Sequence, residues 1–464
     1  MKSIAVIGSG ITGLTSAFLL KQKKCPVEIY EASSRVGGVI QSVRKDGYLA
    51  EFGPNTLLNT SKKIEHLIQM ANLAGHVIFA EDVDQTRFLV RGGKVINMPS
   101  TALGFLTSPL FSWVAKLNLF MEPFRPRWKN KYEETVAHFV RRRFGQEFLT
   151  YAIDALVAGI FAGNPERLSV MHGFPKLYQG EQKYGSLIRT QFFGAHDRKK
   201  RGETSKQEAR VFSFDEGLQV LTDSMAANLD NMLHLNNTVK KITRTPTGWK
   251  VGYLDGDILM EREHSAVLLS TSAYTAQNIA LHTDEKLSLA PLGQISYAPV
   301  TSVVLGYKRS AVGHSLKGFG MLIPGIERFN ILGTLFSTSL FKNRAPEGHV
   351  ALSSYVGGMR QPELAGLPDG KLFELVHNDL VQLLDIKEKP TFQIAHYHSR
   401  AIPQYDVGYG FYKDHVANIQ ERCPGLFIGG NYTRGPALSD NLLSGFDFAD
   451  RIEKYVKEAG LIDG

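Results

Sequence analysis

The stretch SIAVIGSGITGL, residues 3–14, decides the fold of this chain, because an apolar strand turns on three glycines into an apolar helix. Gly8 permits a tight turn, Gly10 lets the backbone approach a pyrophosphate, and Gly13 lets the helix pack on the strand. The helix then points its N–H groups and the positive end of its dipole at the phosphates. The spacing predicts a dinucleotide cradle, with Ile11 and Thr12 inside it.

A second strand is expected over residues 27–31, and it ends in Glu31, about 20 residues beyond the last glycine. A carboxylate at that point takes the ribose hydroxyls of the adenosine half and disfavours the 2′-phosphate of NADP. Glycine turns after strands are common, so the loop alone leaves an ordinary turn open. Arg35 and the pair Gly37-Gly38 follow closely.

The pattern Glu31-x-x-x-Arg35-x-Gly37-Gly38 resembles the extended FAD fingerprint of the flavin amine oxidase, protoporphyrinogen oxidase and phytoene desaturase group. The resemblance implies noncovalent FAD, with the backbone near Val239 meeting the adenine. We expect Ser439-Asp440-Asn441 to cap a last helix that points its N-terminus at the flavin. Further contacts are predicted at Gly53, Pro54, Asn55, Thr56, Gly430 and Leu438.

No second G-x-G-x-x-G follows a strand, so the sequence offers no site for NAD(P)H, and we expect oxygen or a quinone as electron acceptor. The 464 residues and 43% hydrophobic content suit two or three globular domains. The net charge is +8, with basic runs at 125–131, 141–143 and 198–201. Such runs suit anionic lipid or acidic ligands, or they form solvated faces. No recognition motif for nucleic acid accompanies them.

The cysteines, Cys25 and Cys423, lie far apart and indicate neither a disulfide framework nor a thiolate metal site. The cofactor strand begins three residues from Met1, which leaves no room for a cleaved leader. We therefore expect a bacterial cytoplasmic protein.

Residues 61–73 are expected to form an amphipathic helix capped by Ser61, and residues 86–98 a hairpin. No residue between Lys94 and Lys116 is charged, but this run is too polar and too broken by proline to span a membrane. Its aromatic and leucine residues, followed by basic residues, suit a surface that dips into one leaflet. A buried helical subdomain of a soluble protein is the alternative. A helical continuation is expected over 132–163, and a loop over 194–209.

The middle of the chain is similar to the protoporphyrinogen oxidase family. The similarity rests on residues 158–165, 174–187, 318–324, 332–337 and 402–408. It implies a mixed α/β and α+β fold: a discontinuous Rossmann-like FAD domain (1–60, 210–275 and 415–464), a strand-rich substrate domain (61–97 and 276–414) and a helical membrane-binding domain (98–209).

The same resemblance implies a porphyrinogen substrate. Arg87 would hold a propionate, and Phe319, Leu322, Leu335 and Tyr355 would sandwich the macrocycle, with Gly159 leaving space for its edge. Judged by pattern alone, Arg87 is an exposed strand residue and the apolar residues are core. Many relatives carry Asp-Cys where this chain has Asp440-Asn441, which leaves the details of flavin contact open.

The expected reaction is a six-electron oxidation of protoporphyrinogen IX in heme biosynthesis, by hydride transfer to flavin N5, and it requires no catalytic acid or base. His396 and His398 share one face of a strand, but without a third ligand no metal site is predicted. Coproporphyrinogen III is the alternative substrate. More distant alternatives are an amine or polyene oxidoreductase and a non-catalytic flavin-binding membrane protein. The expected partners are oxygen and the cytoplasmic face of the membrane; a homodimer or a complex with a heme-pathway enzyme stays open.

Overall fold

A parallel five-stranded sheet forms around the first strand of the chain. The computed structural model describes residues 2–80, 86–99, 101–129, 132–190 and 209–461. The strands pair in the order β10-β2-β1-β14-β21, and every pairing is parallel. Because both faces of this sheet are covered, its strands are nearly all apolar. Their bounds are Ile4–Ile7 (β1), Val27–Tyr30 (β2), Leu233–His234 (β10), Ala266–Leu269 (β14) and Leu426–Ile428 (β21).

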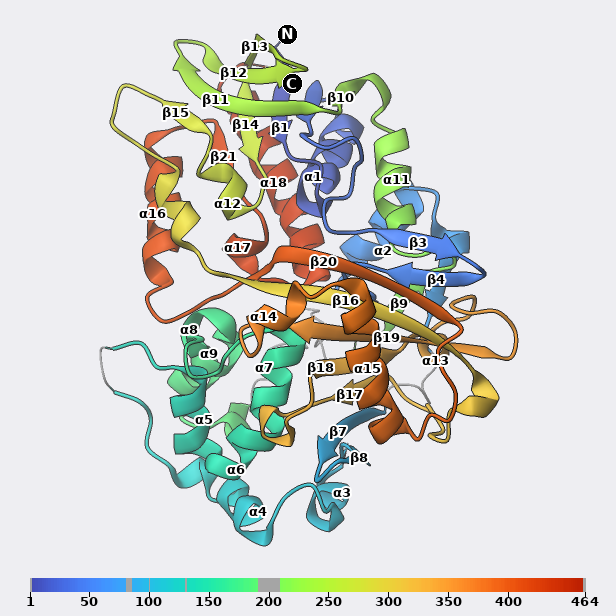
Figure 1. Ribbon diagram of the computed structural model, residues 1–464. Helices are drawn as coiled ribbons and strands as arrows, with labels where there is room; N and C mark the ends of the chain where they lie inside the picture. Colours follow the sequence, from blue (N-terminus) through green and yellow to red (C-terminus); the bar gives the residue numbers. More distant parts are fainter. Residues whose placement is uncertain (1, 81–85, 100, 130–131, 191–208, 462–464) are drawn as a thin grey trace.

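Two long helices pack together beside this sheet: α1 (Ile11–Gln22) and the C-terminal α18 (Leu438–Glu458) (Figure 1). The helix α11 (Gln219–Ala227) also packs on α1. An antiparallel meander of β11 (Asn237–Thr245), β12 (Gly248–Asp255) and β13 (Ile258–His264) joins β10 to β14. The sheet therefore unites the beginning, the middle and the end of the chain.

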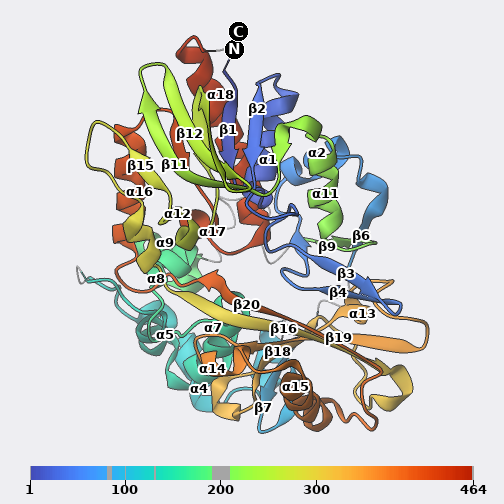
Figure 2. The ribbon, with the colours of Figure 1, turned by 45° about the horizontal axis from the view of Figure 1, so that its top comes forward.

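A second, seven-stranded sheet has the order β20-β16-β19-β18-β17-β7-β8 (Figure 2). One face packs on α15 (Asp369–Leu384), whose Leu372, Val376 and Leu380 join its core. The other face meets the hairpin of β3 (Ser42–Lys45) and β4 (Tyr48–Glu51), where the rings of Tyr48 and Phe392 stack 4.5 Å apart. The strands are Arg87–Arg91 (β7), Lys94–Asn97 (β8), Tyr297–Lys308 (β16), Gly320–Leu322 (β17), Ile331–Phe336 (β18), His349–Gly357 (β19) and Phe392–Pro403 (β20).

Helices occupy the end of the molecule opposite the two termini (Figure 1). The expected helical continuation over 132–163 is broken, because Gly145 adopts φ +92° and ends α5. Within the described residues, no helix is both long and apolar enough to cross a bilayer. The helices are α3 (Ala102–Thr107), α4 (Trp113–Phe120), η3 (Glu122–Phe124), α5 (Val136–Phe144), α6 (Gln146–Phe148), the π-helical turn Leu149–Ile153, α7 (Asp154–Phe161), α8 (Val170–Gly173) and α9 (Pro175–Tyr184).

Two helix caps test the sequence interpretation. Ser61 accepts a hydrogen bond from the Lys63 N–H and caps α2 as predicted, although α2 (Lys62–Met70) ends before residue 73. The predicted cap of the last helix is wrong: α18 begins at Leu438, its N-cap is Ala437, and no side chain caps it. The Ser439 hydroxyl instead exchanges hydrogen bonds with the backbone of Leu58. The basic run 198–201 and the loop predicted over 194–209, except its last residue, lie outside the described residues.

Candidate functional site

The turn after β1 has the geometry that its glycine spacing predicts. A Cβ on Gly13 would lie 2.1 Å from the Gly8 carbonyl oxygen, so the third glycine is enforced by helix–strand packing. A Cβ on Gly10 would meet nothing within 4 Å, and no side chain caps α1 there. The N-terminus of α1 therefore faces open space with its N–H groups free of a cap, as a pyrophosphate requires.

Glu31 follows β2 and holds this turn in place. Its carboxylate accepts hydrogen bonds from the Ser9 N–H at 2.8 Å and the Ser9 hydroxyl at 2.6 Å. It also accepts from the Ser33 N–H at 2.9 Å. The acid therefore lies against the glycine turn, where the ribose of a bound dinucleotide is expected.

The remaining part of the fingerprint forms a loop that touches the first turn. Arg35 donates to the carbonyls of Val36 and Ile40 at 3.0 and 3.1 Å and to that of Gly38, so its guanidinium shapes this loop. A Cβ on Gly38, which has φ +59°, would lie 3.3 Å from the Gly10 Cα. Gly38 therefore lies against Gly10 of the first turn.

The other predicted cofactor residues reach the cradle from distant parts of the chain. Ile11 and Thr12 are buried, and the Thr12 hydroxyl donates to the Asn441 carbonyl at 3.0 Å, so these side chains join α1 to α18. Val239 is buried on β11, and Gly430, at φ +133°, precedes α17 (Asn431–Arg434). Leu438 is the first residue of α18, and Gly53, Pro54, Asn55 and Thr56 follow β4.

The cradle fits FAD. Two long helices, α1 and α18, begin without a side-chain cap, and α1 does so at the open face of Gly10. Glu31 holds the position expected of a ribose ligand. When bound, FAD supplies an acceptor for one hydride, which carries two electrons.

Strand pairing brings four of the six predicted substrate residues onto neighbouring strands, and a fifth directly precedes one of these strands. Arg87 and Leu335 both lie opposite Gly320, on either side of β17. Tyr355 pairs with Gly333, which in turn pairs with Leu322. Phe319 comes directly before β17, and its N–H donates to the Thr86 carbonyl at 2.7 Å. The five residues are Arg87, Phe319, Leu322, Leu335 and Tyr355.

Gly159 on α7 lies against this group, but the space beside it is filled. A Cβ on Gly159 would be 2.6 Å from the Leu322 Cδ2 atom. A ligand edge enters at Gly159 only if the Leu322 side chain changes its rotamer.

Arg87 lies on β7 at the predicted substrate face, beside the Phe319 ring. Its guanidinium carbon lies 5.5 Å from the centre of the Phe319 ring, and among the described residues it has no acidic or hydrogen-bonding side-chain partner. Neighbouring protein lowers its pKa by desolvation, but an arginine stays charged at neutral pH. Its exposed guanidinium is available to a carboxylate.

The basic run on α5 is used within the protein. Arg142 pairs with Glu134 and Glu181, each at 2.9 Å. Arg143 is fully buried and pairs with Glu122 at 3.2 Å and with Glu181. The interpretation of this run as a lipid-binding or solvated face is therefore wrong for Arg143, because a buried guanidinium requires acidic partners.

His396 and His398 lie on β20 above the β3–β4 hairpin. The His396 ring stacks on Phe52 at 4.8 Å, and His398 Nε2 is 2.8 Å from the Phe52 carbonyl oxygen. Burial lowers the pKa of both imidazoles, so both are neutral at pH 7. Across the described ranges, no group of three or more potential ligands gathers to hold a metal ion.

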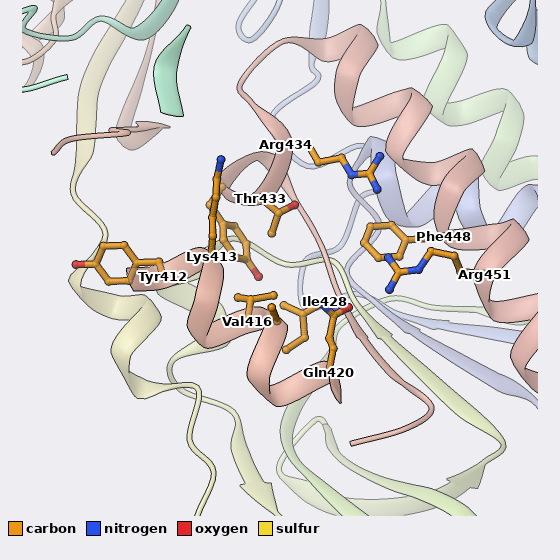
Figure 3. Close-up of a pocket in the computed structure, with 11 residues that line it drawn as sticks. Tyr412, Lys413, Val416, Gln420, Ile428, Thr433, Arg434, Phe448 and Arg451 are labelled. Atoms are coloured by element: carbon orange, nitrogen blue, oxygen red, sulfur yellow. The ribbon is translucent and has the colours of Figure 1, made fainter. Parts of the chain in front are cut away.

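A hollow of about 230 Å³ lies between α16 (Gly410–Arg422), α17 and α18, beyond the edge strand β21 (Figure 3). It contains none of the predicted substrate residues. Arg434 and Arg451 both reach Asp447 there. The hollow is lined by Tyr412, Lys413, Val416, Ala417, Gln420, Ile428, Tyr432, Thr433, Arg434, Phe448 and Arg451.

Known proteins agree with this geometry. The sequence matches the family described as flavin containing amine oxidoreductase over residues 11–452. It is 31% identical to the mitochondrial protoporphyrinogen oxidase of Nicotiana tabacum, with 98% of this chain and 95% of the relative covered. It is 28% identical to the coproporphyrinogen III oxidase of Bacillus subtilis (strain 168), with 95% of each covered. A crystal structure from Exiguobacterium sp. 255-15, described as a candidate protoporphyrinogen oxidase, superposes with a TM-score of 0.79 at 20% identity over 98% of this chain and 99% of that one.

The cradle, the two large sheets and these matches define an FAD-dependent oxidoreductase. The chain belongs to the flavin-containing amine oxidoreductase family. The mixed α/β fold and the FAD cofactor expected from the sequence are thereby confirmed.

Sequence reasoning missed two residues beside this site. Glu51 and Arg344 are both buried charges, and both border a small cavity that Asn55 also lines. No local pattern identifies them, because their proximity arises only when β4 packs on the segment after β18.

Proposed function

We propose that this enzyme oxidises a porphyrinogen, and that protoporphyrinogen IX is its preferred substrate. The observation that carries the proposal is the Arg87 guanidinium, which has no acidic partner among the described residues and lies over Phe319, beside the strands that carry Leu335 and Tyr355. An apolar macrocycle with carboxylate side chains suits this combination, because guanidinium binds carboxylate bidentately. The relatives named protoporphyrinogen oxidase and coproporphyrinogen III oxidase support the same class of substrate.

The residues of the chain position the macrocycle and exclude water from it. The conversion removes six hydrogens, as three hydrides from carbon and three protons, and the ring nitrogens change from four N–H groups to two. We propose molecular oxygen as the final acceptor, with each of three oxygen molecules leaving as hydrogen peroxide. The side chains named above include no acid or base that this balance requires, because tautomerism of the macrocycle moves the remaining protons.

A competition assay tests the substrate. The FAD-loaded protein receives protoporphyrinogen IX and coproporphyrinogen III at equal concentration, with and without oxygen, and the fluorescent porphyrins are separated and quantified. We expect protoporphyrin IX to form faster, because its precursor protoporphyrinogen IX brings two carboxylates to this apolar face, whereas coproporphyrinogen III brings four. Preferential formation of coproporphyrin III assigns the enzyme to the alternative substrate, and flavin that neither porphyrinogen reduces refutes the proposal.

We infer that the helices α3, α4 and η3 bind one leaflet of a membrane, and we place the enzyme at its cytoplasmic face. Large apolar side chains are exposed on these helices, among them Trp113 at 73% and Phe124 at 76%. Lys116, in their midst, folds inward and donates to the carbonyls of Leu106 and Ser108 at 2.7 and 2.9 Å. The apolar surface is thus not interrupted by this cation, and its other members are Leu103, Val114, Leu117, Phe120 and Met121.

Flotation with vesicles tests this surface, and the chain offers a matched control. The double variant Trp113→Ser/Leu117→Ser is expected to lose most vesicle binding, because it removes two central apolar side chains. Ile258→Ser/Leu259→Ser removes two exposed apolar residues from β13, at the opposite end of the molecule, and is expected to bind as wild type does (Figure 1). Equal loss in both variants, or wild-type binding by the α4 variant, contradicts the assignment.

A further inference from the structure

A small cavity is lined by two buried ionisable side chains beside the candidate site. Glu51 on β4 is 3% exposed and Arg344 is 2% exposed, yet in the described structure no direct ion pair joins them. The space between them is about 10 Å³, the size of one water molecule. The cavity is lined by Leu49, Glu51, Asn55, Ser337, Leu340, Phe341 and Arg344.

The two charges keep hydrogen-bonding capacity for such a water. The Glu51 carboxyl group accepts from the Ser42 hydroxyl at 2.6 Å and the Leu218 N–H at 2.8 Å, which leaves further lone pairs. The Arg344 guanidinium donates to Ser213 and to the carbonyls of Phe214 and Asp215, fewer partners than its five N–H groups. A water here is therefore a matched bridge, accepting from Arg344 and donating to Glu51.

The orientation of the Asn55 amide follows from its neighbours. Its Nδ2 atom lies 3.2 Å from the Gly53 carbonyl oxygen and 2.5 Å from the Tyr355 hydroxyl. The Gly53 carbonyl only accepts hydrogen bonds, so the nitrogen and not the oxygen must face it. Both N–H groups of Asn55 are then used, and its Oδ1 atom is left to accept from the second hydrogen of the cavity water.

The Tyr355 hydroxyl can still donate one hydrogen bond. Its oxygen accepts from Asn55, so its own proton points away from that residue. Burial raises the pKa of Tyr355, so the hydroxyl keeps its proton at neutral pH. Among the residues that the structure describes, no acceptor lies within hydrogen-bond distance of this proton.

We propose that the cavity between Glu51 and Arg344 holds one water molecule that fixes the Asn55 amide, and that the Asn55–Tyr355 hydrogen bond thereby sets the Tyr355 hydroxyl as a donor toward the bound tetrapyrrole. This inference rests on the proposed function, because it takes the tetrapyrrole to lie against β19. Tyr355 is then a positioning and discriminating residue, and Asn55, Glu51 and Arg344 act through it.

A hydrogen-bond donor at Tyr355 distinguishes the porphyrinogen substrate from the porphyrin product. The four pyrrole nitrogens of a porphyrinogen carry N–H groups, which donate and do not accept. Oxidation to a porphyrin removes two of these hydrogens and leaves imine nitrogens, which accept a hydrogen bond. A Tyr355 donor therefore stabilises the oxidised ring, and the transition state in which imine character develops at nitrogen, more than the reduced ring, which is the differential binding that raises kcat.

The first test is structural and needs no substrate. A crystal structure of the FAD-loaded protein that resolves ordered water is expected to show one molecule within hydrogen-bond distance of Glu51, Arg344 and Asn55 Oδ1. An empty cavity, or a direct Glu51–Arg344 ion pair in its place, overturns the proposal.

The second test compares two Tyr→Phe variants in the FAD-loaded protein. Tyr355→Phe removes the donor. Tyr307→Phe is the control: Tyr307 lies on β16, away from Asn55, and its buried hydroxyl is 3.0 Å from His377 Nδ1. Titrated with protoporphyrin IX and followed by its fluorescence, Tyr355→Phe is expected to bind roughly five- to tenfold more weakly, and Tyr307→Phe as wild type does. In turnover, kcat should fall in Tyr355→Phe with little change in KM.

The outcomes separate this inference from the proposed function. If wild type binds porphyrin and is reduced by a porphyrinogen, but Tyr355→Phe matches wild type in both, only the donor role fails. If wild type neither binds porphyrin nor is reduced by any porphyrinogen, the proposed function fails and the donor loses its ligand, while the water site is still judged by the crystal structure.

Discussion

The dinucleotide cradle and the substrate face of the seven-stranded sheet are built on opposite principles. In the cradle, backbone crowding fixes residue identity: a Cβ on Gly13 would be 2.1 Å from the Gly8 carbonyl oxygen, and one on Gly53 would be 2.1 Å from that of Val39. On the sheet, Arg87 and Tyr355 instead carry functional groups that internal partners leave available. In the cofactor site, residue identity is thus set by the lack of room for a Cβ atom. On the substrate face, it is set by side-chain groups that can still bind a ligand.

The largest effect is expected from a pair of glycine variants that breaks the cradle in two ways. Gly13→Ala forces α1 away from β1, because the new Cβ meets backbone rather than a flexible side chain. We expect a loss of about 3 kcal/mol or more in the free energy of unfolding, with little soluble protein. Gly10→Ala meets nothing in the protein. The Gly10→Ala variant should fold as a cofactor-free protein, and its affinity for FAD should fall at least tenfold. Flavin stoichiometry and calorimetry measure this loss.

The two variants check each other. If Gly10→Ala retains FAD as wild type does, the open face at Gly10 is not where the pyrophosphate lies. If Gly13→Ala is as stable as wild type in thermal unfolding, the close packing of α1 on β1 does not enforce this glycine.

On the substrate face, Arg87→Ala is expected to raise KM for the porphyrinogen roughly tenfold to a hundredfold while FAD content stays unchanged, because a charge-assisted pair to carboxylate is lost. Arg328→Ala, an exposed arginine at the β17–β18 turn, is the control and should leave KM unchanged. Arg87→Lys should recover only part of the loss, because lysine cannot bind bidentately. Parallel loss of FAD and of substrate affinity would place Arg87 in the fold rather than in the substrate site.

The cradle could be predicted from sequence because its contacts are local. Gly8, Gly10 and Gly13 and the acid after the next strand lie within one βαβ unit, so spacing alone carries the geometry. The hairpin of β7 and β8 and the Ser61 cap follow from short-range rules in the same way.

The rest depends on long-range contacts that no local pattern records. The placement of Arg143 inside the protein required Glu122 and Glu181 from other segments. The cap of α18 was misplaced because Ser439, a strong capping residue in general, packs on Leu58 instead. The Glu51–Arg344 cavity joins two segments that only the folded sheet brings together.

The two regions are also expected to titrate in opposite directions. Burial raises the pKa of Glu51, beside the sheet, from 4.5 to about 7. The folded protein then holds this proton more tightly than the unfolded chain, so its contribution is present below pH 4.5 and is lost as the pH rises through 7. It amounts to about 3 kcal/mol of unfolding free energy, and Glu51→Gln should remove this dependence in denaturation followed from pH 4.5 to 8.

His264, beside β1, provides the opposite case. Burial lowers its pKa from 6.5 to about 4, and its imidazole lies 3.1 Å from the Tyr30 hydroxyl. Its contribution is therefore present above pH 6.5 and is lost as the pH falls through 4. His264→Asn should reduce the loss of unfolding free energy at acid pH, whereas Glu51→Gln should leave that loss unchanged. If either variant changes both pH dependences equally, the two regions do not titrate independently.

The smallest effect is expected at the N-terminus of α18, where the structure corrected the sequence. Ala437 has φ −66° and ψ 135°, the extended conformation of an N-cap residue, but it lacks a side chain that can accept the free N–H groups. Ala437→Ser should raise the unfolding free energy of the cofactor-free protein by about 0.5–1 kcal/mol. If these N–H groups serve the flavin, the gain should vanish when FAD is bound, because the serine oxygen competes with the cofactor for the same donors. Denaturation of both forms measures the difference, and an equal gain in both would mean that the end of α18 does not face the cofactor.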